Sequence, residues 1–150
     1  MVPVMLAMHS QPLPSEQDVE EFSKRFSIPD DYKSFLQRHN GGIPQPNTIR
    51  PDDNVRVINH LLALVSPRGF GESIENYLGL YKDRIPKSNL PIASAGSGDL
   101  LLIDLQDTGS IYYWDHNFEA DSEIAENYYK NLDKIADSFS DLLTTLHEQN

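Results

Sequence analysis

Histidine and carboxylate side chains are the residues of this sequence that could perform acid–base or metal chemistry. Asp115 and His116, together with Asp104, could form a histidine base oriented by a carboxylate. However, no serine lies in a nucleophile elbow, and adjacent strand residues point to opposite faces of a sheet. No two histidines have the spacing that a helical metal site requires; they are His9, His39, His60, His116 and His147. We therefore expect Asp115 and His116 to form a turn and a polar rim, and we expect no catalytic residue, metal or cofactor.

One glycine-rich segment, Gly96-Ser97-Gly98-Asp99, suggests phosphate binding. A phosphate cradle normally opens a helix and often has a lysine nearby. Here an apolar run that predicts a strand begins at Leu100, and the residue before it is an aspartate. The segment therefore predicts a tight turn that leads into a strand.

Three consecutive aromatic residues, Tyr112, Tyr113 and Trp114, could form a ligand platform, because aromatic side chains supply a large contact area at low entropic cost. Alternate residues of a strand covered on both faces would instead pack in the core. We expect at least two of the three to do so.

Charge is the most informative feature of the composition. The chain has 12 basic and 23 acidic residues, a formal net charge of −11, and no Lys or Arg lies between Lys87 and Lys130. This balance argues against nucleic acid or an anionic membrane as a direct ligand. A field of this sign can raise association rates roughly 10- to 10³-fold towards a basic partner. The segment could equally bind a hard cation, but it has no EF-hand-like spacing.

The length of 150 residues predicts a single domain, since folding such a chain buries roughly 68–70% of its unfolded surface. The chain has no cysteine, which excludes a disulfide scaffold and thiolate chemistry, and no apolar run approaches the roughly 18 residues of a membrane span. Met1–Met8 is apolar, but Pro3 interrupts it and no basic residue precedes it, unlike a signal peptide. We expect an N-terminal arm or short strand over residues 1–14, one domain over 15–150, and a cytoplasmic protein.

Hydrophobic spacing and capping residues predict helices near both ends of the chain. Ser15 and Asp18 are typical of a helix start, and Asn40-Gly41-Gly42 predicts a helix stop, because glycine adopts the left-handed cap conformation without steric cost. The predicted elements are two short helices over 15–40, an exposed loop over 43–54, a strand over 55–58 that 61–65 either continues or replaces with a helical turn, a helix over 73–82, extended connections at Ile85-Pro86 and Leu90-Pro91, a hairpin of strands 100–105 and 111–114, and a helix with Phe139, Leu142, Leu143 and Leu146 on one face, capped by Asp137 or Ser138. Helices at both ends with a sheet between them predict the α+β class.

Several of these motifs, in this order, resemble the SMI1/KNR4 (SUKH) superfamily. The resemblance begins with Ile28-Pro29-Asp30-Asp31-Tyr32, followed by Phe35-Leu36 and by the Asn-Gly-Gly stop. It continues in the second half with Leu90-Pro91-Ile92-Ala93, Gly96-Ser97-Gly98-Asp99, Gly109 to Trp114-Asp115-His116, and Ile135-Ala136-Asp137-Ser138-Phe139, and so covers about residues 15–147.

The resemblance implies an α+β fold with a central, largely antiparallel sheet flanked by N-terminal and C-terminal helices. It also implies a non-enzymatic role. Bacterial members are regarded as immunity proteins that neutralise toxins, often nucleases or other nucleic-acid-modifying effectors, whereas fungal members are linked to cell-wall synthesis and signalling.

The leading hypothesis is an immunity protein that occludes the active site or substrate groove of a basic toxin domain. The alternatives are a signalling or scaffold adaptor and an enzyme that uses Asp104, Asp115 and His116. Asp104 is left out of the candidate contacts because its strand is expected to be buried. The candidate partner-binding residues are the carboxylates of the region without basic residues and two aromatic anchors: Asp99, Asp107, Tyr112, Trp114, Asp115, Glu119, Asp121, Glu123 and Glu126.

Overall fold

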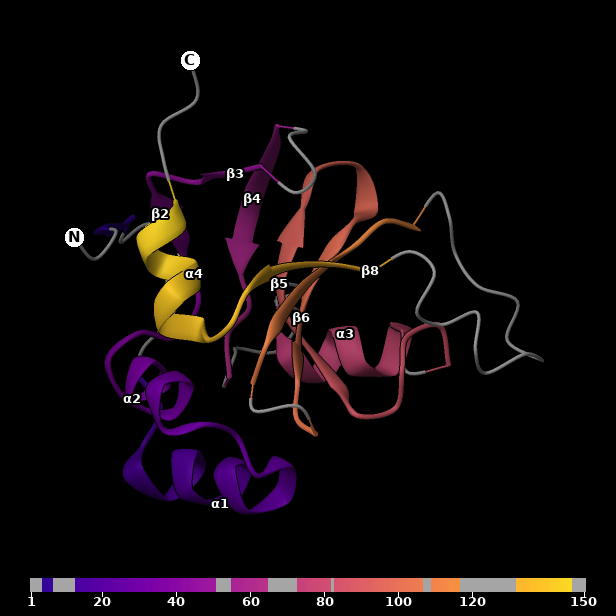
Figure 1. Cartoon of the computed structure of the whole chain (residues 1–150). Helices are drawn as coiled ribbons and strands as arrows, with labels where there is room; N and C mark the ends of the chain where they lie inside the picture. The colour runs from indigo at the N-terminus through magenta and orange to yellow at the C-terminus, as the bar shows by residue number, and fades with distance from the viewer. Residues whose placement is uncertain are drawn as a thin grey trace.

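The computed structural model describes residues 4–6, 13–50, 55–64, 73–81, 83–106, 109–116 and 132–146. These residues form an α+β fold in which helices flank a six-stranded antiparallel sheet (Figure 1). In chain order the elements are β1 (Val4–Leu6), α1 (Glu16–Phe26), α2 (Asp30–Arg38), β2 (Ile43–Gln45), β3 (Thr48–Ile49), β4 (Arg56–Leu61), α3 (Ile74–Tyr81), β5 (Asn89–Ala95), the 3₁₀ turn η3 (Gly96–Gly98), β6 (Leu100–Asp104), β7 (Ile111–Trp114), β8 (Leu132–Ala136) and α4 (Phe139–Thr145).

Each strand of the main sheet pairs with the strand that follows it in the chain. The order is β3-β4-β5-β6-β7-β8, and every pair is antiparallel. β1 and β2 form a separate antiparallel pair, in which Val4 lies opposite Gln45. The α+β class and the largely antiparallel central sheet are thus confirmed.

Strand β6 separates two hydrophobic layers. Leu101 and Ile103 join a core that also contains residues of α1, α2 and α4, whereas Leu100 and Leu102 pack on the opposite face with Trp114. Helices α1, α2 and α4 lie on one side of the sheet and α3 on the other (Figure 1). Because both faces are covered, the strand appears in the sequence as an almost continuous apolar run.

The first helix begins as its capping residues predict, and the second begins after Pro29 with two acidic residues. Ser15 and Asp18 form a reciprocal capping box at the start of α1, and the carboxylates of Asp30 and Asp31 lie in the first turn of α2, near the positive end of its dipole. Of the two residues predicted to cap the last helix, Ser138 does so, accepting a hydrogen bond from the backbone N–H of Asp141.

The helix does stop before Asn40-Gly41-Gly42, but not through the left-handed glycine cap that the sequence predicts. Helix α2 ends at Arg38, and its C-cap residue, His39, has an extended backbone conformation. No left-handed glycine therefore caps the helix. Gly41 is left-handed (φ +80°), but it lies beyond the helix, where an added Cβ would come within 3.1 Å of the backbone carbonyl of Leu61. The buried side chain of Asn40 accepts a 2.7 Å hydrogen bond from the backbone N–H of Leu64. These residues therefore join α2 closely to the sheet.

Two predicted irregular segments contain strands. Within residues 43–54, described as far as residue 50, β2 and β3 form, and Thr48 and Ile49 are buried, so the exposed loop is wrong there. Leu90-Pro91 is not a connection but part of β5, where the register shifts between Pro91 and Ala93. A proline cannot donate to a ladder, and a bulge is where a central strand can accommodate it.

The sequence prediction assigned no strand after β7. The structure adds β8, which pairs with β7 and places Leu132 opposite Trp114. The predicted strand over 55–58 is β4, which continues to Leu61 rather than giving way to a helical turn. Ala63 then forms an isolated bridge with Ser73, just before α3. In the part of the chain that the structure describes, no helix has the length and apolar character needed to cross a bilayer.

Candidate functional site

Three polar side chains that the sequence analysis considered, Asp99, Asp115 and His116, gather at the open end of the hairpin of β6 and β7. Leu100 of β6 lies opposite Trp114 of β7, so Asp99, just before β6, meets Asp115 and His116, just after β7. The 3₁₀ turn η3 sets the position of Asp99, because the Asp99 N–H donates to the Gly96 carbonyl. The tight turn predicted for the glycine-rich segment is therefore confirmed.

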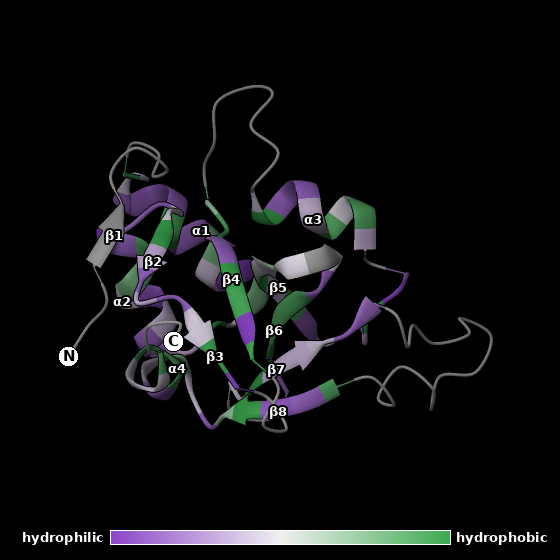
Figure 2. Cartoon of the chain, turned by 90° about the horizontal axis from the view of Figure 1, so that it is seen from above, coloured by the Kyte–Doolittle hydropathy of each residue, from purple (hydrophilic) through white to green (hydrophobic). Residues whose placement is uncertain are grey.

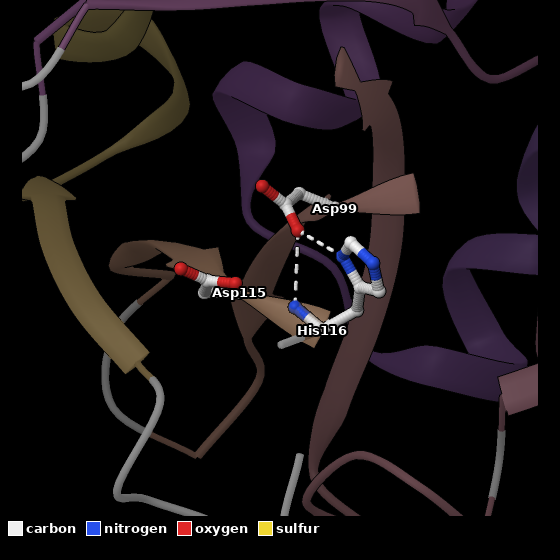
Figure 3. Close-up of side chains that lie close together, drawn as sticks. All are labelled: Asp99, Asp115 and His116. Carbon is white, nitrogen blue, oxygen red and sulfur yellow. Dashed lines mark hydrogen bonds and ion pairs between the residues drawn. The ribbon is translucent and has the colours of Figure 1, made fainter. Parts of the chain in front are cut away.

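Asp99 is a buried carboxylate that accepts hydrogen bonds from three donors. Its Oδ1 lies 2.6 Å from Nδ1 of His116 and accepts a 3.0 Å hydrogen bond from the backbone N–H of the same residue (Figure 3). Its Oδ2 accepts a hydrogen bond from the hydroxyl of Tyr113. The side chain of Asp99 is 6% exposed, compared with 31% for His116. The carboxylate therefore holds the imidazole at the surface and the phenol in the core.

Burial and the neighbouring carboxylate determine the behaviour of Tyr113. Loss of solvent raises the pKa of the Tyr113 hydroxyl far above its usual range, and the hydrogen bond to Asp99 raises it further. The hydroxyl is therefore a permanent neutral donor rather than an acid or base in use near neutral pH. Its role in this arrangement is to fix the carboxylate.

Asp99, Asp115 and His116 each offer one ligand atom within 4.8 Å of the others. His–carboxylate sets of this kind suit first-row transition metals. In Figure 3 the Asp99 carboxylate lies between the Asp115 carboxylate and the imidazole, and Nδ1 of His116 is directed at Asp99. A metal bound through Nδ1 would have to replace this hydrogen bond, so the geometry suits an oriented imidazole better than a preformed metal site.

The carboxylate that orients His116 is not the one considered in the sequence. Asp104 ends β6, whereas Asp99 precedes it, and the two are therefore at opposite ends of the strand. Asp104 accepts a 2.9 Å hydrogen bond from the backbone N–H of Gln106 and belongs to the hairpin turn. The triad of Asp104, Asp115 and His116 that served as the enzymatic alternative does not form.

Two of the nine candidate contact residues are buried. Asp99 and Trp114 are only 4% and 1% exposed, so neither is a surface contact as predicted. Trp114 is covered because Tyr81 of α3 packs edge-on against it at 5.7 Å between ring centroids. With Tyr113 also buried, the expectation that at least two of the three aromatic residues lie in the core is confirmed.

Two other candidates are half-buried: Tyr112 and Asp115. Tyr112 lies in β7 opposite Lys134 of β8, and Asp115 lies next to the Asp99–His116 pair (Figure 3). The remaining five lie outside the described residues: Asp107, Glu119, Asp121, Glu123 and Glu126.

A pocket of about 350 Å³ lies beside this cluster, between the sheet and α3. The residues that line it come from five elements and one connection: Asn59 and His60 of β4, Tyr77 and Tyr81 of α3, Ser94 and Ala95 of β5, Gly98 of η3, Leu100 of β6, and Asp99 between η3 and β6. The rings of Tyr77 and Tyr81 are stacked with centroids 5.7 Å apart. The pocket thus combines one carboxylate with two phenol rings.

The sequence analysis did not select His60, Tyr77 or Tyr81 as functional residues. The two tyrosines lie within the helix predicted over residues 73–82, and they pack partly on the second hydrophobic layer. His60 is buried, and its Nδ1 lies 2.6 Å from the carbonyl of Leu61, so that nitrogen carries the proton. One available signal was the composition of residues 74–81, which contain a single charged residue although they form a surface helix.

Comparisons with known proteins agree with this architecture. The family model of the SMI1 / KNR4 family (SUKH-1) matches residues 13–145. The chain is also similar to the SPbeta prophage-derived uncharacterized protein YokK of Bacillus subtilis (strain 168), with 26% identity over 138 residues that cover 81% of this chain and 68% of that protein.

Proposed function

Because this chain belongs to the SMI1/KNR4 family, which is generally non-enzymatic and includes immunity proteins, we propose that it is an immunity protein that binds and neutralises a cognate bacterial toxin. The single observation that carries the proposal is the match over residues 13–145, which spans nearly all the described structure. In this proposal residues 15–150 act as one protein-binding domain in the cytoplasm, where the toxin would meet its target.

The charge of the chain supports a basic partner. A toxin that acts on nucleic acid must present a basic surface to its substrate, and a protein with a net charge of −11 is attracted to such a surface. The acidic residues of the proposed contact are Asp107, Asp115, Glu119, Asp121, Glu123 and Glu126, and the proposed aromatic contact is the half-buried Tyr112. Occlusion of the active site or substrate groove would then need no catalytic group on this chain.

The buried cluster supports a structural role rather than catalysis. The Asp99 carboxylate is engaged by Tyr113 and His116, and the phenol is held as a neutral donor. Such an arrangement fixes the start of β6 and the end of β7 and so presents Asp115 from a rigid base.

The direct test is co-expression with a candidate toxin domain taken from a gene that neighbours this one. We expect the toxin alone to stop growth, and we expect the wild-type chain to restore growth and to co-purify with the toxin. Absence of both rescue and complex would refute the immunity proposal and favour an adaptor that binds a cellular protein.

The electrostatic part is tested by the salt dependence of binding. We expect reversal of Asp107, Glu119, Asp121, Glu123 and Glu126 to lysine to slow association and to weaken its dependence on ionic strength. The control is reversal of three exposed glutamates of α1, Glu16, Glu20 and Glu21, which are not among the proposed contact residues. If the association rate fell equally per reversed charge in both variants, binding would depend only on net charge and not on these particular residues.

A further inference from the structure

The pocket between the sheet and α3 has a lining that suits a specific cationic side chain. We propose that it receives an arginine of the partner protein, with the guanidinium directed at the Asp99 carboxylate and packed against the rings of Tyr77 and Tyr81. This inference rests on the proposed function, since it names a contact within the complex. It keeps Asp99 from the predicted contact residues and adds Tyr77 and Tyr81, which the sequence analysis did not select.

The carboxylate supplies the charge. Asp99 accepts from Tyr113, from the backbone N–H of His116 and from Nδ1 of His116. A carboxylate has about four acceptor positions, so one remains. Among the residues that the structure describes, the pocket lining contains neither Lys nor Arg. A buried carboxylate strongly favours a cation that can reach it.

The tyrosines supply the packing surface. A guanidinium is planar, is weakly hydrated compared with an ammonium, and stacks on aromatic rings, which distinguishes arginine from lysine as the occupant. The protein already uses this chemistry nearby, because the guanidinium of Arg84 lies 4.7 Å from the ring centroid of Tyr81 and 5.6 Å from that of Trp114. The volume of about 350 Å³ is near the lower end of the roughly 300–1,000 Å³ typical of ligand pockets, which leaves ample room for one long side chain.

The surface around the pocket is suited to protein contact. Leu80, next to Tyr81, is 60% exposed, and nothing lies within 4 Å of a Cβ built at Gly79. Beyond Asn76 helix α3 carries only apolar and weakly polar residues, drawn green and white in Figure 2. An aromatic pocket beside exposed apolar surface is the usual composition of the centre of a protein interface.

The first test uses a probe that does not require the toxin. The ¹⁵N-labelled full chain is titrated with N-acetyl-arginine amide, and the control titration uses N-acetyl-citrulline amide, which has the same shape without the charge. We expect saturable shifts of the amide signals of Gly98 and Asp99, and of Tyr77 and Tyr81, with the arginine derivative only. Equal shifts with both compounds, or none with either, would overturn the proposal.

The same spectra distinguish a metal site. Addition of Mn²⁺ would broaden the signals of Asp99, Asp115 and His116 together if these residues bound a divalent cation. Selective broadening at micromolar Mn²⁺, with no response to the arginine derivative, would overturn the proposal and show that the site binds a metal ion instead.

A pair of lysine substitutions tests the pocket within the complex. Asn59 is exposed and lines the pocket, so Asn59→Lys places a competing cation at its entrance without disturbing the core. The matched control is Gln37→Lys, which makes the same change at an exposed position of α2, on the other side of the sheet. We expect Asn59→Lys to abolish the shifts caused by the arginine derivative and to weaken toxin binding about tenfold or more, and Gln37→Lys to do neither.

The two proposals fail in different ways. If the wild-type chain rescues growth but the arginine derivative does not bind and both lysine variants bind the toxin equally, immunity stands and the pocket is wrong. If the arginine derivative binds selectively but no toxin is neutralised, the pocket stands as an arginine site for another protein.

Discussion

The imidazole Nδ1 of His116 lies 2.6 Å from a carboxylate oxygen of Asp99, although the two residues are 17 positions apart. The antiparallel pairing of β6 with β7 brings them together, because the residue before one strand meets the residues after the other. The same carboxylate also receives the hydroxyl of Tyr113 and the backbone N–H of His116. One buried side chain therefore ties both strands of the hairpin at its open end.

The first prediction concerns the removal of this carboxylate. Asp99→Ala deprives the buried Tyr113 hydroxyl and two donors of His116 of their acceptor, so we expect a loss of about 2–4 kcal/mol in the free energy of unfolding, measured by urea denaturation. Asp99→Asn keeps a carbonyl acceptor, so we expect its free energy of unfolding to fall less than that of Asp99→Ala. The exposed control, Glu21→Ala, should stay within about 0.5 kcal/mol of the wild type. A stable Asp99→Ala variant would show that the cluster contributes little.

The second prediction compares two buried tyrosines. The hydroxyl of Tyr32 has no hydrogen-bond partner in the described part of the chain, whereas that of Tyr113 donates to Asp99. Tyr32→Phe removes a buried polar atom without breaking a bond, so we expect it to be neutral or to stabilise by up to about 1 kcal/mol. Tyr113→Phe breaks a hydrogen bond to a buried carboxylate, so we expect a loss of about 1.5–3 kcal/mol. Equal effects in denaturation experiments would contradict this difference.

The third prediction is a loss of stability at alkaline pH. Burial raises the pKa of Tyr32 and of Tyr113 in the folded state well above the value of about 10 in an unfolded chain. Above that pH the unfolded chain releases these protons and the native state retains them, so the free energy of unfolding falls as the pH rises. Above about pH 10 we expect the free energy of unfolding to fall more steeply for the wild type than for Tyr32→Phe. The tyrosinate absorbance that appears on unfolding measures this difference. Parallel curves for the two proteins would argue against a raised pKa of Tyr32.

The fourth prediction concerns two glycines. Gly109 has φ +84°, and a Cβ at this position would lie 2.5 Å from Cγ of Pro29, so Gly109→Ala is expected to cost about 2–4 kcal/mol. Gly79 lies within α3 with nothing within 4 Å of an added Cβ, so Gly79→Ala is expected to stabilise by about 0.5–1 kcal/mol. Thermal unfolding of the two variants measures both effects, and a shift of the same sign in both would be inconsistent with this account.

The helices were predictable because their signals are local. Ser15 with Asp18, and Ser138 before the last helix, mark starts through side chains that cap their own first turn. The hairpin of β6 and β7 was predictable for a similar reason, since two runs of strand-forming residues flank a turn with Gly109. These elements are the ones whose sequence pattern and final packing agree.

The missed strands depend on partners that lie elsewhere in the chain. Strand β3 has only two residues and forms by pairing with Arg56 and Val57 of β4. Strand β8 contains Asp133 and Lys134, so it lacks the apolar pattern of a central strand and owes its conformation to pairing with β7. Pro91 enters β5 at a register shift, which no local rule indicates.

The site was the least predictable part. The sequence singled out Asp115 and His116, but the orienting carboxylate is Asp99 rather than Asp104, because the register of β6 with β7 decides which residues meet. Trp114 was a candidate for surface contact, but Tyr81 of α3 covers it. Both outcomes follow from tertiary pairing, which a single sequence does not contain.

The contact between α2 and α4 limits how early the core can fold while the chain is being synthesised on the ribosome. The Tyr32 ring packs against that of Phe139 at 4.9 Å, and Asp31 accepts a 2.9 Å hydrogen bond from the backbone N–H of Ser140, 109 residues later. The apolar face of α2 is thus completed by a helix that leaves the exit tunnel long after α2 itself. A nascent chain arrested before residue 139 would leave Tyr32 and Phe35 without the Phe139 ring, so this part of the core closes only after α4 has been synthesised.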